Sequence, residues 1–279
     1  MMKNPPVVLT IAGSDNSCGA GIQADLKTIT ALGGYAQTAL TCVVAEVPGR
    51  VEAIQALRPA IVAEQIRMCF EAFPVAAVKT GMLYSAAIIR AVASALGEVK
   101  HPLLLVVDPV MVASSGAPLL KPSAIAAYRS LLFPIATLVT PNLDELRILS
   151  GMPCRDLEEI KLAGDRLVQR HACAFLLKGG HLQASTATDI LATPSGMETF
   201  TAPFHKNIET HGTGCTFSAA IATHLAAGHS LSASVGLAKN YITGAIAKCL
   251  HWKNASALDH RISPDPELKP RRQPIMFPS

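Results

Sequence analysis

Short apolar runs alternate along the chain with longer segments of helical period. The strand-like runs cover residues 7–12, 39–45, 75–79, 103–108, 137–140 and 175–178, and two further strand-like pieces cover 188–192 and 198–202. Apolar residues at spacings of three and four predict helices over 22–32, 61–73, 85–96, 123–132, 157–171, 216–227 and a last helix ending near 250. This alternation is typical of a mostly parallel sheet, and nearly all-apolar strands indicate helices on both of its faces. We expect an α/β sandwich.

Polar or glycine-rich segments follow the ends of most of these strands. They read GSDNSCGAG, KTGM, DPVM with SSG, TPN and KGGH along the chain. In an open parallel sheet, the carboxyl ends of the strands meet at one edge, and ligands bind in the crevice beside it. The pattern therefore predicts that these segments form a single site.

Composition narrows the class of protein. The 279 residues are 50% hydrophobic, with a net charge of +4 and no cluster of basic residues interleaved with aromatic ones, which argues against a nucleic-acid partner. Seven scattered cysteines without a C-x-x-C pair favour neither a zinc site nor a disulfide framework. No apolar run approaches the ~20 residues that span a bilayer, and the N-terminal apolar stretch is too short for a signal peptide. We expect no membrane partner and a cytoplasmic location.

The segment His211-Gly212-Thr213-Gly214-Cys215-Thr216 directly precedes a predicted helix. Two glycines let the backbone approach a ligand closely, and the N–H groups at a helix start form a cradle for an anion such as phosphate. A helix N-terminus also favours a thiolate, so we expect a lowered pKa for Cys215. The alternative is a glycine-rich turn that contains a buried cysteine.

Acidic and amide side chains stand at two other strand ends. Asn142 and Glu145 are three residues apart, which is the spacing of a helix capping box, but their oxygens could also hold Mg²⁺ through water. Asp108 ends an apolar strand and points to the same edge, where either metal binding or turn formation explains it. Lys178 ends another strand before two glycines, which suits either phosphate binding or a snorkelling side chain.

The first loop fits a rival interpretation. Gly19-Ala20-Gly21 begins a G-x-G-x-x-A pattern typical of dinucleotide-binding folds, with Glu46 at the end of the next strand. In those folds the glycines follow the strand at once, whereas residues 13–18 intervene here. That interpretation also leaves the segments HGTGC, KGGH and TPNLDE without a role, so we disfavour it.

Taken in order, TIAGSDNSCGAGIQADLKT, KTGML, DPVM, TPNLDE, LLKGGH and HGTGCTFSAAI resemble the hydroxymethylpyrimidine/phosphomethylpyrimidine kinases of thiamine biosynthesis, within the ribokinase-like superfamily. The resemblance implies a three-layer α/β sandwich with a mostly parallel central sheet, a homodimer, and ATP and Mg²⁺ as cofactors. It implies transfer of the γ-phosphate of ATP to a pyrimidine hydroxymethyl group, then to the monophosphate. We expect one kinase domain over 1–253 and a proline-rich tail over 254–279.

The same resemblance assigns roles to individual residues. Substrate contacts are implied for Gly13, Asp25, Val44, Glu46, Met82 and Val110. ATP contacts are implied for Asn142, Lys178, Thr213 and Lys239, and Mg²⁺ contacts for Asp108 and Glu145. Catalysis is implied for Cys215 as the proton acceptor, with Gly212 and Gly214 in the anion hole.

Glu46 departs from the family pattern, which commonly has glutamine there. A carboxylate can only accept hydrogen bonds, so Glu46 fits an aminopyrimidine best when a ring nitrogen is protonated. A pyridoxal-type kinase is the nearest alternative, because both substrates are flat heterocycles that carry CH₂OH. A vitamin-binding regulator without turnover is a third reading.

Overall fold

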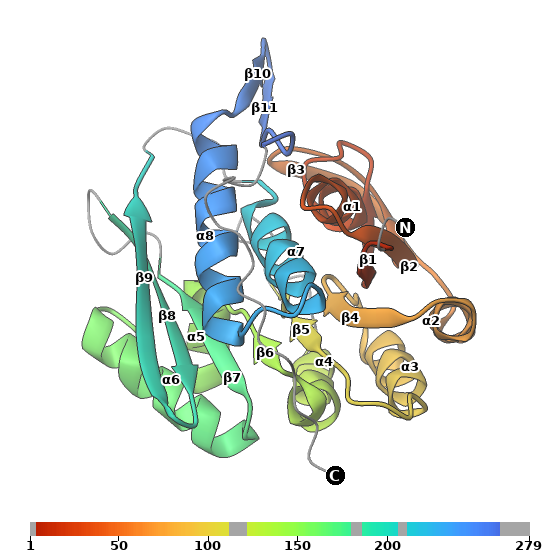
Figure 1. Ribbon diagram of the computed structural model, residues 1–279, viewed down its shortest axis with the longest axis horizontal. Helices are drawn as coiled ribbons and strands as arrows, with labels where there is room; N and C mark the ends of the chain where they lie inside the picture. Colours follow the sequence, from red (N-terminus) through yellow and green to blue (C-terminus); the bar gives the residue numbers. More distant parts are fainter. Residues whose placement is uncertain (1–3, 112–121, 180–185, 206–210, 263–279) are drawn as a thin grey trace.

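The computed structural model describes residues 4–111, 122–179, 186–205 and 211–262, and the statements below concern these residues (Figure 1). The predicted SSG segment, the last two residues of KGGH, and residues 263–279 of the predicted tail lie outside them.

A nine-stranded, mostly parallel sheet runs through the described part of the chain in the order β3-β2-β1-β4-β5-β6-β7-β8-β9. The strands are β1 (Val7–Asp15), β2 (Tyr35–Val47), β3 (Arg50–Ala56), β4 (Val75–Thr80), β5 (Leu105–Val107), β6 (Leu138–Val139), β7 (Ala174–Lys178), β8 (Thr186–Thr193) and β9 (Gly196–Pro203). Neighbouring strands are parallel along the series β2, β1, β4, β5, β6 and β7. At the two edges of the sheet, β3 pairs antiparallel with β2, β8 with β7, and β9 with β8.

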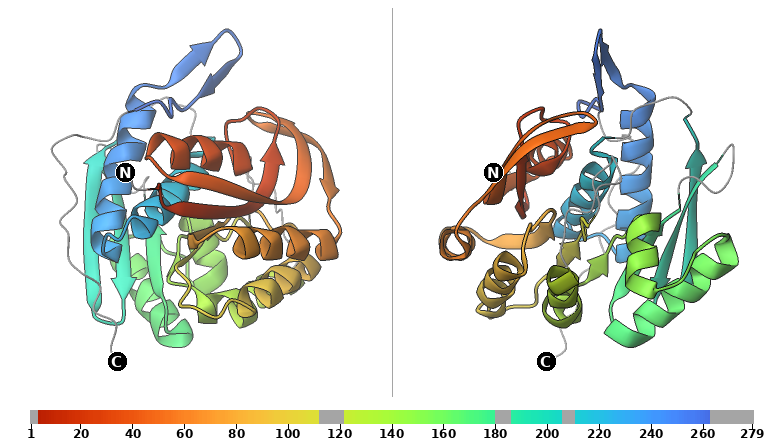
Figure 2. Two further views of the ribbon diagram at one scale, coloured as in Figure 1. Left: turned by 45° about the vertical axis from the view of Figure 1, so that its right-hand side comes forward. Right: turned by 180° about the vertical axis from the view of Figure 1, so that it is seen from behind.

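Helices cover both faces of this sheet, which confirms the predicted three-layer sandwich (Figure 2). One face carries α1 (Gly21–Ala31), α7 (Thr213–Ala226) and α8 (Leu231–Ala247). The other carries α2 (Pro59–Ala72), α3 (Ala86–Gly97), α4 (Pro122–Ala127), α5 (Leu143–Ser150) and α6 (Leu157–His171). A π-helical turn (Tyr128–Leu132) and a 3₁₀ turn (Phe133–Ile135) continue α4.

Burial on both faces explains why the strand sequences do not alternate. Along β1, Leu9 and Ile11 pack into the core under α2 and α3, while Val8 packs into the core under α7 and α8. Burying one such side chain contributes about 1.5–3 kcal/mol, so an apolar residue stabilises the fold at every position of a central strand.

The structure differs from the sequence prediction at two edges of the molecule. Strand β3 was not predicted; its residues are mostly exposed and Val47-Pro48-Gly49 turns the chain back from β2. A hairpin of β10 (Leu250–Trp252) and β11 (Ala255–Ala257) crosses the expected domain boundary at 253/254. Leu258 and His260 then return to the body and are buried there, so the folded unit extends beyond residue 254.

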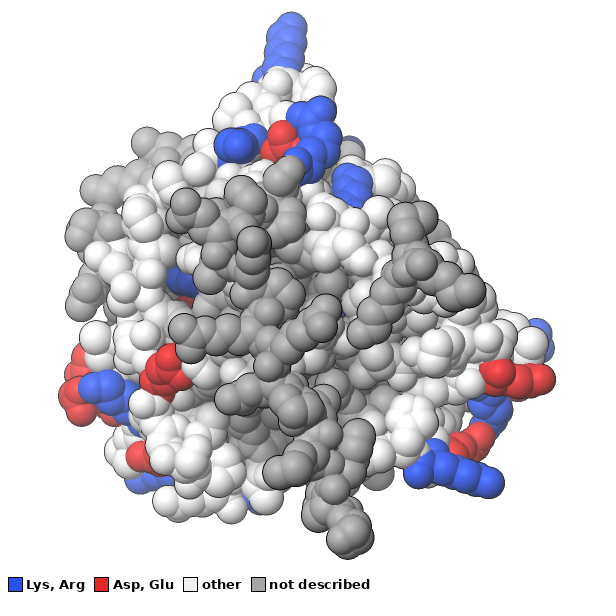
Figure 3. All heavy atoms as spheres, in the orientation of Figure 1, with Lys and Arg blue, Asp and Glu red and all other residues white. Residues whose placement is uncertain are grey.

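The surface supplies two plain observations. No helix in the described ranges is both long and apolar enough to cross a membrane. Figure 3 shows the Lys and Arg side chains of one face in small groups near its periphery, mostly beside Asp or Glu.

Candidate active site

A cavity of about 570 Å³ lies at the carboxyl ends of the parallel strands, where the sequence predicts a site. Its lining includes every predicted site residue except Asp25. These are Gly13, Val44, Glu46, Met82, Asp108, Val110, Asn142, Glu145, Lys178, Gly212, Thr213, Gly214, Cys215 and Lys239.

The glycine-rich turn at the start of α7 is fixed by close backbone packing. Gly212 is the N-cap, with a left-handed φ of 81°, and a Cβ there would lie 1.8 Å from the Gly19 carbonyl oxygen. A Cβ on Gly214 would lie 3.2 Å from Lys178 Nζ and 3.6 Å from Asp108 Oδ2. Only glycine lets this turn touch the first loop on one side and face the charged groups on the other. Helix α7 starts three residues earlier than predicted, so Cys215 belongs to its first turn.

Cys215 is half-buried at the junction of α7 and α1. Burial raises the pKa of its thiol to about 11, against the opposing effects of the Lys79 ammonium and of the Gly21 N–H, which donates to the sulfur. The expected lowering of this pKa is therefore wrong. The Lys79 charge and the Gly21 N–H act in the predicted direction, but loss of water around the sulfur outweighs them.

Asp25 lies under the floor of the cavity rather than on its wall. Its carboxylate is fully buried and accepts hydrogen bonds from Lys79 Nζ, at 2.8 and 2.9 Å, and from Thr10 Oγ1. The structure thus does not place Asp25 against a substrate. The sequence did not indicate its partner Lys79, although Lys79 is the first residue of the segment KTGML, which resembles the kinase family.

Asp108 and Lys178 form the charged side of the cavity. Lys178 Nζ lies 3.2 Å from Asp108 Oδ1, while Ser218 Oγ donates to Asp108 Oδ2 at 3.3 Å. Asp108 is almost fully buried, and the negative charges around Lys178 raise the pKa of that lysine even though burial opposes its charge. The Lys178 ammonium is therefore charged at neutral pH, and both side chains face the glycine-rich turn.

Asn142 and Glu145 do form the predicted capping box at the start of α5. Asn142 Oδ1 accepts from the Glu145 N–H at 2.9 Å, and Glu145 Oε2 accepts from the Asn142 N–H at 2.8 Å. Glu145 Oε1 also accepts from the Met111 N–H. The structural role is thus confirmed, and both side chains still line the cavity.

The pair Glu145 and Asp108 fits a magnesium ion by its chemistry. Burial raises the pKa of Glu145 above its ordinary value, and the negative charge of Asp108 raises it further. Two crowded carboxylates with their oxygens in a polar cavity are the donors that Mg²⁺ takes, directly or through water. A divalent cation here would relieve their repulsion.

The first loop ties the two ends of the site together, a link that sequence reasoning missed. Asp15 accepts hydrogen bonds from the Ser17 and Ala20 N–H groups and lies 3.0 Å from His211 Nε2, just before the glycine turn. Asn16 Oδ1 accepts from the Glu46 N–H at 2.7 Å. The interaction of Asp15 with histidine and with loop N–H groups lowers its pKa in spite of burial.

Another part of the cavity is a largely apolar slot beside Glu46, whose carboxylate lies within 4.8 Å of Asp15 and His211. Val44, Met82 and Val110 line it as predicted, and Val51 and Ile54 of the unpredicted strand β3 extend it. Burial raises the pKa of Glu46, and the nearby Asp15 charge adds to the effect. The dipeptide Pro48-Gly49 between two β-branched runs was the sequence signal for this hairpin.

Lys239 lines the far wall of the cavity from α8. Its ammonium donates to Asp189 Oδ2 at 2.5 Å, and both side chains are almost fully buried. Its expected phosphate contact stays a prediction.

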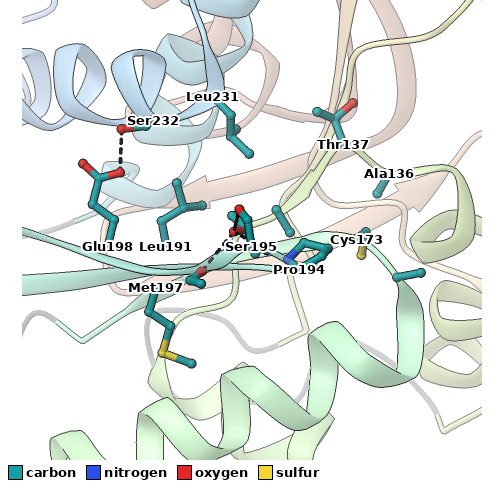
Figure 4. A pocket seen from close by; sticks show the side chains of 14 residues that line it. Ala136, Thr137, Cys173, Leu191, Pro194, Ser195, Met197, Glu198, Leu231 and Ser232 are labelled. Carbon is teal, nitrogen blue, oxygen red and sulfur yellow. Dashed lines mark hydrogen bonds between the residues drawn. The ribbon is translucent and has the colours of Figure 1, made fainter.

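A second cavity, of about 630 Å³, lies at the opposite edge of the sheet (Figure 4). Its walls are mainly small and apolar, and its acidic residue Glu198 accepts a hydrogen bond from Ser232. No group of converging charges or nucleophiles is found among the residues that line it. Its volume therefore does not make it a candidate active site.

Comparisons with known proteins agree with this geometry. A family model described as phosphomethylpyrimidine kinase matches residues 15–258. The thiamine biosynthesis bifunctional protein ThiED of Geobacter sulfurreducens is 47% identical over 239 residues, which are 86% of this chain but only 49% of that protein. The hydroxymethylpyrimidine/phosphomethylpyrimidine kinase of Streptomyces coelicolor is 44% identical over 242 residues, covering 87% of this chain and 89% of that one.

Among solved structures, the Staphylococcus aureus pyridoxal kinase in complex with AMP-PCP and pyridoxal has a TM-score of 0.83. It is 32% identical, with 92% of this chain and 94% of that chain covered. The chain thus spans about half the length of the Geobacter protein and nearly all of the other two.

Proposed function

We propose, because the chain belongs to the phosphomethylpyrimidine kinase family, that it transfers the γ-phosphate of ATP to 4-amino-5-hydroxymethyl-2-methylpyrimidine and then to the monophosphate. The product is the pyrimidine pyrophosphate used in thiamine biosynthesis. A homodimer stays an expectation from the family resemblance, and a cytoplasmic location stays an expectation from the sequence composition.

One observation carries this proposal. A thiol, a glycine-rich helix start and a lysine–aspartate pair line a cavity that also holds a largely apolar slot with Glu46 beside it. A flat heterocycle fits the slot, and its CH₂OH group then reaches Cys215. Phosphoryl transfer depends mainly on such positioning and on neutralising negative charge.

In this mechanism the substrate alcohol lies between Cys215 and the terminal phosphoryl group. Its oxygen attacks phosphorus, and the bond to the leaving group ADP breaks. The proton of the alcohol passes to Cys215 in its thiolate form, which is the minor form of this buried thiol. The N–H groups of the glycine turn and the Lys178 ammonium stabilise the charge on the transferring group. Asn142 contacts the phosphates from the start of α5.

Asp108 and Glu145 would hold the magnesium ion through carboxylate oxygens. When bound, Mg²⁺ neutralises phosphate charge and orients the nucleotide. The chain's own contribution is to keep these two acids close together and buried beside Lys178.

A pyridoxal-type kinase is the second candidate, and the similarity to the Staphylococcus aureus pyridoxal kinase favours it. ADP release should be measured with hydroxymethylpyrimidine, its monophosphate and pyridoxal. We expect the two pyrimidines to give the higher kcat/KM. A preference for pyridoxal would support the alternative, and no ADP from any of these alcohols would support a regulator without turnover.

Replacing the proton acceptor tests the mechanism. We expect Cys215→Ala to lower kcat by about 10²–10⁴-fold, the usual contribution of a positioned acid or base, while ATP affinity changes little. Cys69→Ala, on the remote helix α2, is the matched control and should keep full activity. Near-normal turnover of the Cys215 variant would remove the proton-acceptor role.

A further inference from the structure

Lys79 places a buried ammonium directly below the active site. It is the second-last residue of β4, in register with Thr10 of β1 and Val106 of β5, and it is fully buried. Its Nζ donates to both carboxylate oxygens of Asp25. An ammonium has three hydrogens, so one remains for a further acceptor.

Cys215 lies close enough to Lys79 for their charges to interact. Helix α7, which carries Cys215, packs on α1 and on β4, the elements that carry Asp25 and Lys79. Gly21, one helical turn before Asp25 in α1, donates its N–H to the Cys215 sulfur. The Lys79 ammonium lies at the carboxyl end of β4, because a Cβ on Gly81, the residue after this strand, would be 3.0 Å from Nζ.

The charges around the sulfur separate into two kinds. Lys79 favours the thiolate, whereas Asp25 of α1 and Asp108, which follows β5, disfavour it. Burial opposes the charge on Lys79, but Asp25, Cys215 and Asp108 together raise its pKa above the ordinary value, so it stays protonated. Lys178 also acts on Cys215 in favour of the thiolate, but Lys79 has the larger effect on the sulfur.

We propose that Lys79 is the counter-ion of the Cys215 thiolate and that Asp25 holds it in place. Lys79 is a positioning residue, because it acts on the reaction only through the sulfur. When the substrate proton moves to the thiolate, the sulfur becomes neutral and the ammonium keeps Asp25 as its partner, so Lys79 itself neither gains nor loses a proton. The link to turnover rests on the proposed function, whereas the link to thiol reactivity does not.

The experiment measures the reactivity of the thiol without any substrate. Iodoacetamide reacts with thiolates, so its rate at Cys215, followed by mass spectrometry of the peptide that contains it, reports the thiolate fraction. At pH 8 we expect Lys79→Met to slow this alkylation about tenfold or more, because one pKa unit changes the thiolate fraction tenfold. Lys79→Arg keeps the charge and should recover most of the rate.

The variant Asp25→Asn tests the direction of the change in the Cys215 alkylation rate. It removes a negative charge near the sulfur and frees the ammonium to pair with it, so alkylation of Cys215 should become faster than in the unaltered chain. A purely structural ion pair predicts the same direction for Lys79→Met and Asp25→Asn, since either change loosens the same contact. Equal directions, or no change in either variant, would overturn the proposal.

Lys239→Met is the matched control for losing a buried ammonium. Lys239 lines the same cavity and pairs with Asp189, but it is not among the main charges that act on Cys215. Its loss should leave the alkylation rate of Cys215 unchanged. If Lys79→Met does not fold, as judged by circular dichroism, Asp25→Asn and Lys79→Arg still decide the sign. Failure of the proposed function would appear separately, as absence of ADP release by the unaltered enzyme.

Discussion

Glu46 sets the polar edge that the slot presents to a substrate ring. Its backbone is tied to the first loop through Asn16, and its carboxyl group is half-buried near Asp15. An acid in that position accepts two hydrogen bonds from a protonated aminopyrimidine edge, whereas an amide accepts one and donates one. Either pattern fits the same ring in a different protonation state.

Because glutamate and glutamine both fit the ring edge, the two residues should be nearly interchangeable at position 46. Glu46→Gln should keep kcat/KM for hydroxymethylpyrimidine within about tenfold, while Glu46→Leu, which leaves the ring edge unsatisfied, should lower it about 10²-fold or more. Steady-state ADP release gives both values, and pyridoxal is the comparison substrate. A loss with glutamine as large as that with leucine would mean that Glu46 reads a different ring edge.

At the scale of elements, the contact between the first loop and the start of α7 holds the site in shape. Gly212 packs against Gly19, and a Cβ on Gly19 would in turn lie 2.8 Å from the His211 ring. Asp15 adds a hydrogen bond to His211 across the same junction. Displacing either segment would move the N–H groups of the turn away from a bound phosphate.

A pair of glycine variants tests this junction. Gly212→Ala and Gly228→Ala both force alanine into a left-handed conformation, with φ of 81° and 91°, but only the first meets other atoms within 4 Å. Each should lose about 1–2 kcal/mol of stability from backbone strain. Gly212→Ala should also lower kcat about 10²-fold or more, because the turn must shift. Equal activities would show that the junction does not matter for turnover.

The same elements show what the sequence could and could not predict. The carboxyl ends of the parallel strands were located to within three residues, because apolar runs and the polar segments after them depend only on local pattern. Strand β3 was missed because its exposed residues carry no core signal. Asp25 was misplaced, and Lys79 missed, because the sequence does not reveal which face of α1 packs on the sheet. The predicted lowering of the Cys215 pKa was wrong because the burial of the thiol depends on neighbours from distant segments of the chain.

At the scale of the whole molecule, the C-terminal segment closes over the helix that carries the site. His260, which follows β11, is buried, and its Nε2 lies 3.0 Å from Thr216 Oγ1 in the first turn of α7. Its backbone carbonyl accepts from the Tyr241 hydroxyl of α8. Residues beyond the expected boundary at 254 therefore pack against the start of α7, which carries the glycine-rich turn.

This buried histidine predicts how stability changes with acid. Burial lowers the pKa of His260 to about 4, while an unfolded chain binds a proton near pH 6.5. Between these values the unfolded state carries more protons, so stability falls as the pH drops from 6.5 toward 4. The free energy of unfolding from this residue alone should decrease by about 2 kcal/mol between pH 7.5 and 5.

His260→Gln should remove that part of the acid sensitivity. Glutamine does not titrate and can still bond with Thr216, so urea unfolding at pH 7.5 and 5 should show a loss about 2 kcal/mol smaller than in the unaltered chain. His251→Gln, an exposed histidine on strand β10, is the matched control and should keep the original difference. If both variants lose the same stability as the unaltered chain, His260 is protonated within the fold, and the C-terminal segment does not bury it in solution.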